Sequence, residues 1–177
     1  LRSVSQGLVT YTTDFRVFPP SYVYTPKPDS ETPEWKLEDQ QGTSGGKKYV
    51  YWSNFLFTAG GVPENAFECP TAQGKGAPRA NPGSDERDWE PGQTDDNGNT
   101  TPNSSAVRDF QVRRNAYALN EGIIPRNKLA NQGQRSYRLV NPSVADSATR
   151  GAAGVILGAE YYSNNNWESL KADADGP

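Results

Sequence analysis

Carboxylate and amide side chains gather around a glycine in the segment DDNGNT, residues 95–100. Calcium prefers oxygen ligands on a bent loop, and here they would come from Asp95, Asp96, Asn97 and Asn99. The segment lacks the glutamate that closes a calcium loop, and Asx-rich loops are commonly plain solvated turns. Both interpretations stay open, and a weaker form of the pattern recurs at Asp173 and Asp175.

A thiol, an acid and an aromatic group could also carry chemistry. Cys69 has no basic cluster beside it in sequence, so a buried small apolar residue is favoured over a reactive thiol. Glu160 could belong to a glycosidase-like carboxylate pair, but a structural acid bound by a backbone amide or an arginine is favoured. Tyr161, Tyr162 and Trp167 could stack on sugars, although core and loop-pinning roles are favoured.

The composition excludes several classes of site. The chain of 177 residues has no histidine and one cysteine, which rules out Ser-His-Asp and Cys-His catalysis, His-ligated metals and an internal disulfide. A net charge of −3 with dispersed Lys and Arg gives no basic surface for nucleic acid. No apolar run reaches the ~18 residues that span a membrane. We predict no catalytic residue and no cofactor, with calcium as the open case.

A helix over residues 1–15 is the element that could position a binding surface. Apolar residues recur there at spacings of three and four, which is typical of one helix face. This packing stripe comprises Leu1, Val4, Leu8, Tyr11 and Phe15. Phe18-Pro19-Pro20 ends the helix. Since the periodicity starts at the first residue without a capping side chain, we expect the end of a longer N-terminal helix, with a short terminal helix as the alternative.

The rest of the chain is predicted to form short strands separated by long loops. Strands are expected at 49–52, 66–69, 115–119, 136–140 and 154–162, and a short helix at 53–57. Residues 70–105, rich in Pro, Gly and mutually repelling carboxylates, are predicted to form an acidic surface insertion, remote from the helix and ordered mainly by Trp89. We predict one α+β domain over residues 1–177, with the helix packed on a small antiparallel sheet.

Several short motifs carry a resemblance to a known family. The opening LRSVSQGLVTYTTDFRVFPP is similar to the segment NLKQIGLALxxYxxDxxxxFPP of bacterial prepilin-like proteins with a cleaved and methylated leader, notably those of planctomycetes. AFECPTA at 66–72 resembles their Cys-Pro segment, and RRNAYALNEG at 113–122 resembles their Tyr-x-x-Asn turn. The segment from Arg138 to Tyr162 resembles their Asn-Pro-Ser and Ile-Leu-x-x-Glu strand. The family's leader lies upstream of such a segment, and its usual His- and Asp-Gly-containing tail is not present.

The resemblance implies the globular head of a type IV pilin or type II secretion pseudopilin. It implies an inner-membrane precursor anchored by an upstream apolar helix, with the head in the periplasm or on an extracellular filament. The implied partners are other pilin or pseudopilin subunits and the secretion or pilus assembly machinery, and the implied work is mechanical and adhesive rather than catalytic. The alternative is an extracellular glycan- or surface-binding module that uses its Trp and Tyr loops.

Overall fold

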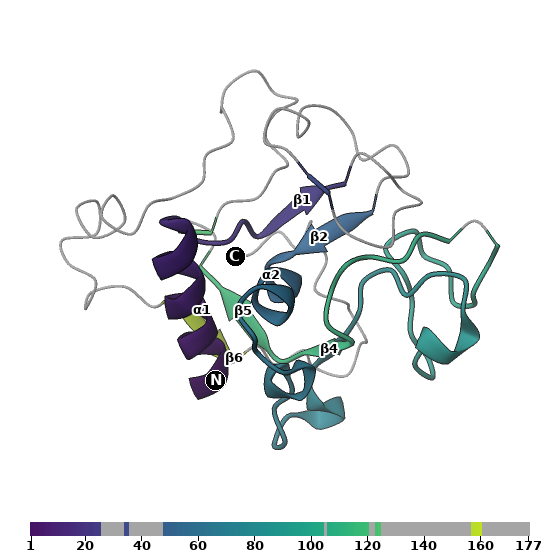
Figure 1. The fold of residues 1–177 in the computed structure, drawn as a ribbon. Helices are drawn as coiled ribbons and strands as arrows, with labels where there is room; N and C mark the ends of the chain where they lie inside the picture. Colours follow the sequence, from purple (N-terminus) through teal and green to yellow (C-terminus); the bar gives the residue numbers. More distant parts are fainter. Residues whose placement is uncertain (26–33, 36–47, 105, 121–122, 125–156, 161–177) are drawn as a thin grey trace.

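The computed structural model describes residues 1–25, 34–35, 48–104, 106–120, 123–124 and 157–160 (Figure 1). Its elements in chain order are α1 (Arg2–Phe15), β1 (Tyr22–Tyr24), β2 (Tyr49–Tyr51), α2 (Trp52–Thr58), η2 (Glu64–Phe67), η3 (Gln73–Lys75), β3 (Ala77–Pro78), η4 (Glu86–Asp88), β4 (Arg114–Asn115), β5 (Tyr117–Leu119) and β6 (Gly158–Glu160). Figure 1 shows α1 at one side of the described part and the loops of the 70–105 segment at the other.

Helix α1 forms where the spacing predicts it. Its first turn has no side-chain cap, and Thr12 and Thr13 return their hydroxyls to carbonyl oxygens one turn back. The helix ends at Arg16, which takes the left-handed conformation with φ 60° and donates its backbone N–H to the Thr12 carbonyl. Pro19 and Pro20 follow and prevent the helix from continuing.

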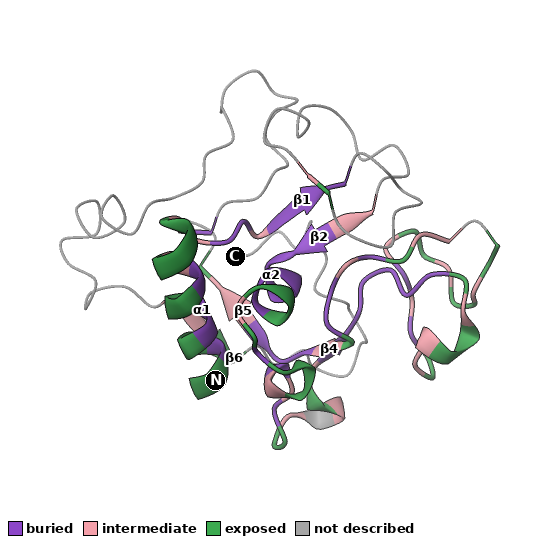
Figure 2. Cartoon of the chain, in the orientation of Figure 1, coloured by how far each residue is buried: buried purple, intermediate pink, exposed green. Residues whose placement is uncertain are grey.

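Strands β1 and β2 pair antiparallel, and their alternation separates two kinds of side chain. Val23 and Val50 are paired, fully buried, and belong to the same apolar cluster as the inner face of α1. The tyrosines flanking these valines lie on the other face of the pair, because successive side chains of a strand alternate. Tyr22, Tyr24 and Tyr51 pack there with Ala80 of the 70–105 segment. Both faces of the pair are therefore covered (Figure 2).

Two short helical elements follow β2. The short helix expected at 53–57 is α2, which begins at Trp52, so the strand ends one residue earlier than predicted. The strand predicted at 66–69 is wrong, because residues 64–67 form the 3-10 helix η2. Pro63 caps this turn and accepts a hydrogen bond from the Ala66 N–H, an arrangement that favours helical backbone directly after proline.

The α+β prediction is confirmed, with antiparallel pairing throughout the named strands. Within the described residues, however, the single small sheet is replaced by three two-stranded pairs: β1–β2, β3–β4 and β5–β6. Each strand has only two or three residues, and glycine or proline residues occur close to several of them. Backbone of this kind favours bends over long ladders. None of the helices in the described part of the chain is long and apolar enough to cross a membrane.

Candidate functional site

The inner face of α1 is formed by Val4, Gly7, Leu8 and Tyr11, a set with the spacing i, i+3, i+4, i+7. The side chains of Val4, Leu8 and Tyr11 are 1%, 5% and 5% exposed. The Tyr11 ring lies edge-on against Phe55 of α2, with 6.1 Å between ring centroids. Burial raises the pKa of the Tyr11 hydroxyl to about 12, so the ring stays neutral against the core.

Gly7 sets how closely α1 approaches the rest of the domain. A Cβ added at this position would lie 2.1 Å from the Val62 Cγ2, well inside van der Waals contact. Val62 is itself 4% exposed, and its backbone N–H donates to the Leu56 carbonyl at the end of α2. Sequence reasoning about side chains missed Gly7 in this face, although its spacing from Val4 is the helical one.

The predicted stripe is wrong at its two ends. Leu1 and Phe15 are 49% and 52% exposed, and Val9, which the stripe did not include, is 65% exposed. The domain contacts α1 around Gly7, near the middle of the helix, so the first and last turns extend past the covering elements. Phe15 contacts the Tyr11 ring, with 4.4 Å between centroids. Figure 2 shows the resulting division of α1 into a buried and an exposed side.

A groove of about 290 Å³ runs along the flank of α1. Its walls are mostly apolar and include Leu1 and Val9 from α1, Phe18 after it, and Leu119 and Leu157 beside the β5–β6 pair. Leu119 and Leu157 are only half-buried. The exposed apolar side chains of α1 and this groove therefore form one continuous surface, which we call the α1 face.

The predicted acidic insertion is built differently from a solvated loop. Arg79 is 8% exposed, and its Nε donates to the Gln111 carbonyl at 3.1 Å. Gln93 is 1% exposed and donates from Nε2 to the Arg79 carbonyl at 2.6 Å. Burial and the nearby Arg108 charge lower the pKa of the Arg79 guanidinium. The insertion therefore has a buried polar interior that its composition did not indicate.

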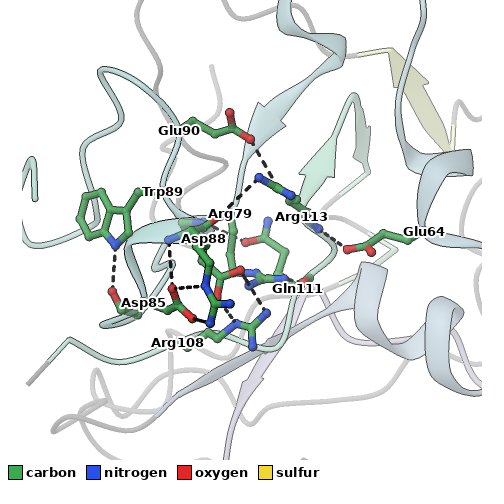
Figure 3. Close-up of polar contacts among 12 residues, drawn as sticks. Glu64, Arg79, Asp85, Asp88, Trp89, Glu90, Arg108, Gln111 and Arg113 are labelled. Atoms are coloured by element: carbon green, nitrogen blue, oxygen red, sulfur yellow. Dashed lines mark hydrogen bonds and ion pairs between the residues drawn. The ribbon is translucent and has the colours of Figure 1, made fainter. Parts of the chain in front are cut away.

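The carboxylates of the insertion are paired with arginines rather than left to repel one another (Figure 3). Asp88 lies 3.2 Å from Arg108, and Glu90 lies 3.1 Å from Arg114 and 3.6 Å from Arg113. These arginines follow the insertion in the chain, so a local count of charge could not reveal them. Most of the pairs are partly exposed, and each contributes at most about 1 kcal/mol.

Trp89 is half-buried and holds the insertion by one hydrogen bond. Its Nε1 donates to the Gly83 carbonyl at 2.9 Å, which ties two parts of the insertion together. Asp85 nearby receives hydrogen bonds from Arg87, which lower the pKa of the Asp85 carboxyl to about 2. Trp89 is thus one anchor among several, not the main one that was predicted.

The Asp95–Asn99 segment forms a closed turn. The Asp95 carboxylate is buried and accepts hydrogen bonds from the Asn97 and Asn99 backbone N–H groups and from the Asn99 side chain, at 2.8–2.9 Å. Asp96 is half-buried and Asn97 is exposed. No group of three or more His, Cys, Asp or Glu side chains within the described ranges could hold a metal ion. This geometry corresponds to the solvated-turn interpretation, in which the side chain stabilises its own backbone.

Two residues that were considered separately lie together in the structure. Cys69 is 5% exposed, as expected, and its Sγ donates to Glu160 Oε1 at 3.0 Å while also lying 3.1 Å from Thr71 Oγ1. The partner of Glu160 is therefore a thiol rather than the predicted backbone amide or arginine. Burial, with added repulsion from Cys69 and Glu160, raises the pKa of the nearby Tyr117 hydroxyl. This cluster fixes β6 against the segment that follows η2.

Several predictions fall outside the described residues. They concern the aromatic group Tyr161, Tyr162 and Trp167, the acids Asp173 and Asp175, the strand at 136–140 and most of the strand at 154–162. Of the last, residues 158–160 form β6, which pairs with β5.

No family model, curated protein or solved structure matches this chain significantly. A function is therefore assigned from the geometry above together with the motifs of the sequence.

Proposed function

We propose that this chain is the globular head of a filament subunit, of the type IV pilin or type II secretion pseudopilin kind. The observation that carries the proposal is the two-sided use of α1. One side docks onto the domain through Val4, Leu8 and Tyr11, and the other leaves Val9 exposed beside an apolar groove. Large contiguous apolar surfaces on a folded domain commonly mark interaction sites.

In this proposal the α1 face contacts neighbouring subunits, and an upstream membrane helix of the precursor continues into α1. The first turn of α1 carries no side-chain cap and no acidic residue, so nothing in its own side chains favours a helix start there. The proposed role is structural, since the acids of the insertion are paired with arginines and the Cys69 thiol is buried. The motif resemblance in residues 1–20, 66–72 and 113–122 supports the same assignment.

The experiment places one charge on the α1 face of the full-length protein in the bacterium that produces it. Val9→Asp introduces a carboxylate where an apolar contact is proposed, and we expect it to abolish recovery of the protein in sheared surface filaments. Thr10→Asp is the matched control, because Thr10 is also exposed on α1 and lies one position further round the helix. We expect Thr10→Asp to assemble at close to the wild-type level.

Folding and assembly are separated by a second measurement. Val9 is 65% exposed, so Val9→Asp should leave the unfolding free energy of the purified head within about 0.5 kcal/mol of the wild type. A Val9→Asp protein that is stable and still enters filaments would contradict the proposed contact. A wild-type protein that never sediments with filaments would contradict the assignment as a whole.

A further inference from the structure

A buried acid joins the insertion to strand β2. Asp109 is 3% exposed. Its Oδ1 accepts the Tyr49 backbone N–H at 2.9 Å, and its Oδ2 accepts Asn81 Nδ2 at 2.7 Å. The Asp109 backbone N–H in turn donates to the Asn81 carbonyl at 3.0 Å. Asp109 therefore connects β2 with the buried part of the insertion from both its side chain and its backbone.

A second carboxylate reaches the same amide. Asn81 Nδ2 donates to Asp96 Oδ2 at 3.4 Å and to Asp109 Oδ2 at 2.7 Å, so one amide nitrogen bridges the two acids. Asn81 Oδ1 accepts the Asp96 backbone N–H at 3.3 Å, which fixes the amide's orientation. Two carboxylates bridged in this way in a buried site resist ionising together, because each negative charge disfavours the other.

The remaining charged and titratable neighbours do not neutralise the pair. Arg79 attracts Asp109, but its guanidinium is directed to the Gln111 carbonyl and toward Asp88. On the β2 side the nearby titratable group is Tyr51, whose buried hydroxyl has no hydrogen-bond partner within the described residues. Burial raises the pKa of that hydroxyl most, and Asp109 and Asp96 raise it further, so Tyr51 stays neutral at physiological pH.

We propose that Asp109 and Asp96 share one proton and form a proton-dependent latch between the insertion and strand β2. With the proton in place, the pair carries one negative charge, and Asn81 bridges it. Loss of that proton leaves two buried negative charges on either side of one amide. The repulsion then loosens the Asp95–Asn99 turn and the insertion from the tyrosine face of β1–β2.

The direction of the pH effect follows from Asp109. Burial, with repulsion from Asp96, raises the pKa of its carboxyl to about 8, against about 3.9 for an ordinary aspartate. The folded chain therefore holds a proton that the unfolded chain has released, so this contribution to stability is fully present below about pH 4 and is lost as pH rises toward 8. Over that range each pH unit should raise the unfolding equilibrium constant by up to about tenfold.

The chain offers a clean window for the measurement. It has no histidine, so side chains with ordinary pKa values are silent between about pH 5.5 and 7.5. We expect urea unfolding of the wild type to show the rise in unfolding constant across this window. Asp109→Asn should remove the pH dependence, and Asp96→Asn should reduce it several-fold, because the like charge is gone. Asp14→Asn, on exposed α1, is the control and should follow the wild type.

A direct titration keeps the test independent of whether Asp109→Asn folds. The side-chain carboxyl carbon of Asp109, followed by NMR in the wild type, should titrate above about pH 7 and shift downward in Asp96→Asn. Amide exchange at Tyr49 and Asn97, corrected for intrinsic rates, should increase more from about pH 6 to about pH 8.5 than exchange in α2. An Asp109 midpoint near about pH 4, or an unfolding constant that stays constant over the window, would overturn the latch.

Discussion

The substitution Gly7→Ala tests how α1 is seated on the domain. In an isolated helix this change is favourable, since alanine exceeds glycine by about 0.8–1.0 kcal/mol in helix propensity. Here the new Cβ would lie 2.1 Å from Val62 Cγ2, well inside normal contact. Overpacking a buried contact costs about 1–3 kcal/mol, and this clash belongs at the upper end. We therefore expect a net loss of about 2 kcal/mol.

The assay is urea unfolding of the purified head, with Ser5→Ala as the control. Ser5 is exposed on the same helix, so Ser5→Ala should be neutral or slightly stabilising. With an m-value of about 2 kcal/mol per molar urea, Gly7→Ala should lower the midpoint by about 1 M. A midpoint that rises, as helix propensity alone predicts, would refute the close approach.

A double-mutant cycle identifies the partner of the clash. Val62→Ala removes two buried methyl groups and should cost about 2 kcal/mol alone. In the double mutant the methyl group added at position 7 occupies the space that Val62 Cγ2 vacates. The two losses should then fall short of additivity by about 1–2 kcal/mol. Additive losses would show that Gly7 is constrained by something other than Val62.

Three further outcomes are expected. Leu8→Ala should destabilise the head by about 2–5 kcal/mol, whereas Phe15→Ala should cost less than about 1 kcal/mol because half of that side chain is exposed; thermal melts compare the two. Trp89→Phe should cost about 1 kcal/mol through loss of the bond to the Gly83 carbonyl, and limited proteolysis should then cut the insertion faster. Because Asp95 already accepts three N–H bonds from its own turn, the melt should be identical in chelator and in millimolar calcium, and a rise in midpoint with calcium would reinstate the metal loop.

Local patterns predicted the elements that depend on local forces. The helix at 1–15 follows from spacing and from Pro19-Pro20, and the short helix after Tyr51 follows from the pattern before Gly60-Gly61. The failures are at places where a distant segment decides. Phe15 fits the stripe but lies half exposed at the last turn of α1, and Gly7 has no side chain for a periodicity argument to find.

The insertion shows the same limit more strongly. Its acids are unopposed when only neighbours in sequence are counted, yet their partners are Arg108, Arg113 and Arg114. Buried polar residues such as Asn81 and Gln93 are placed by hydrogen bonds to other side chains and to backbone. Nothing in the amino-acid types distinguishes them from solvated loop residues. The pairing of Cys69 with Glu160 likewise joins positions 91 residues apart.

The two-faced burial of β1–β2 has a consequence for the order of folding. The valine face can close early, since α1, α2 and both strands lie before residue 59. The tyrosine face waits for Ala80, and the edge of β2 waits for Phe110, whose N–H and carbonyl bond to Tyr49 and Tyr51. Chain elongation at about 5–20 residues per second leaves that face uncovered for several seconds. Nascent chains should therefore expose a short tyrosine-rich hairpin, and they would then be most prone to wrong pairing with one another.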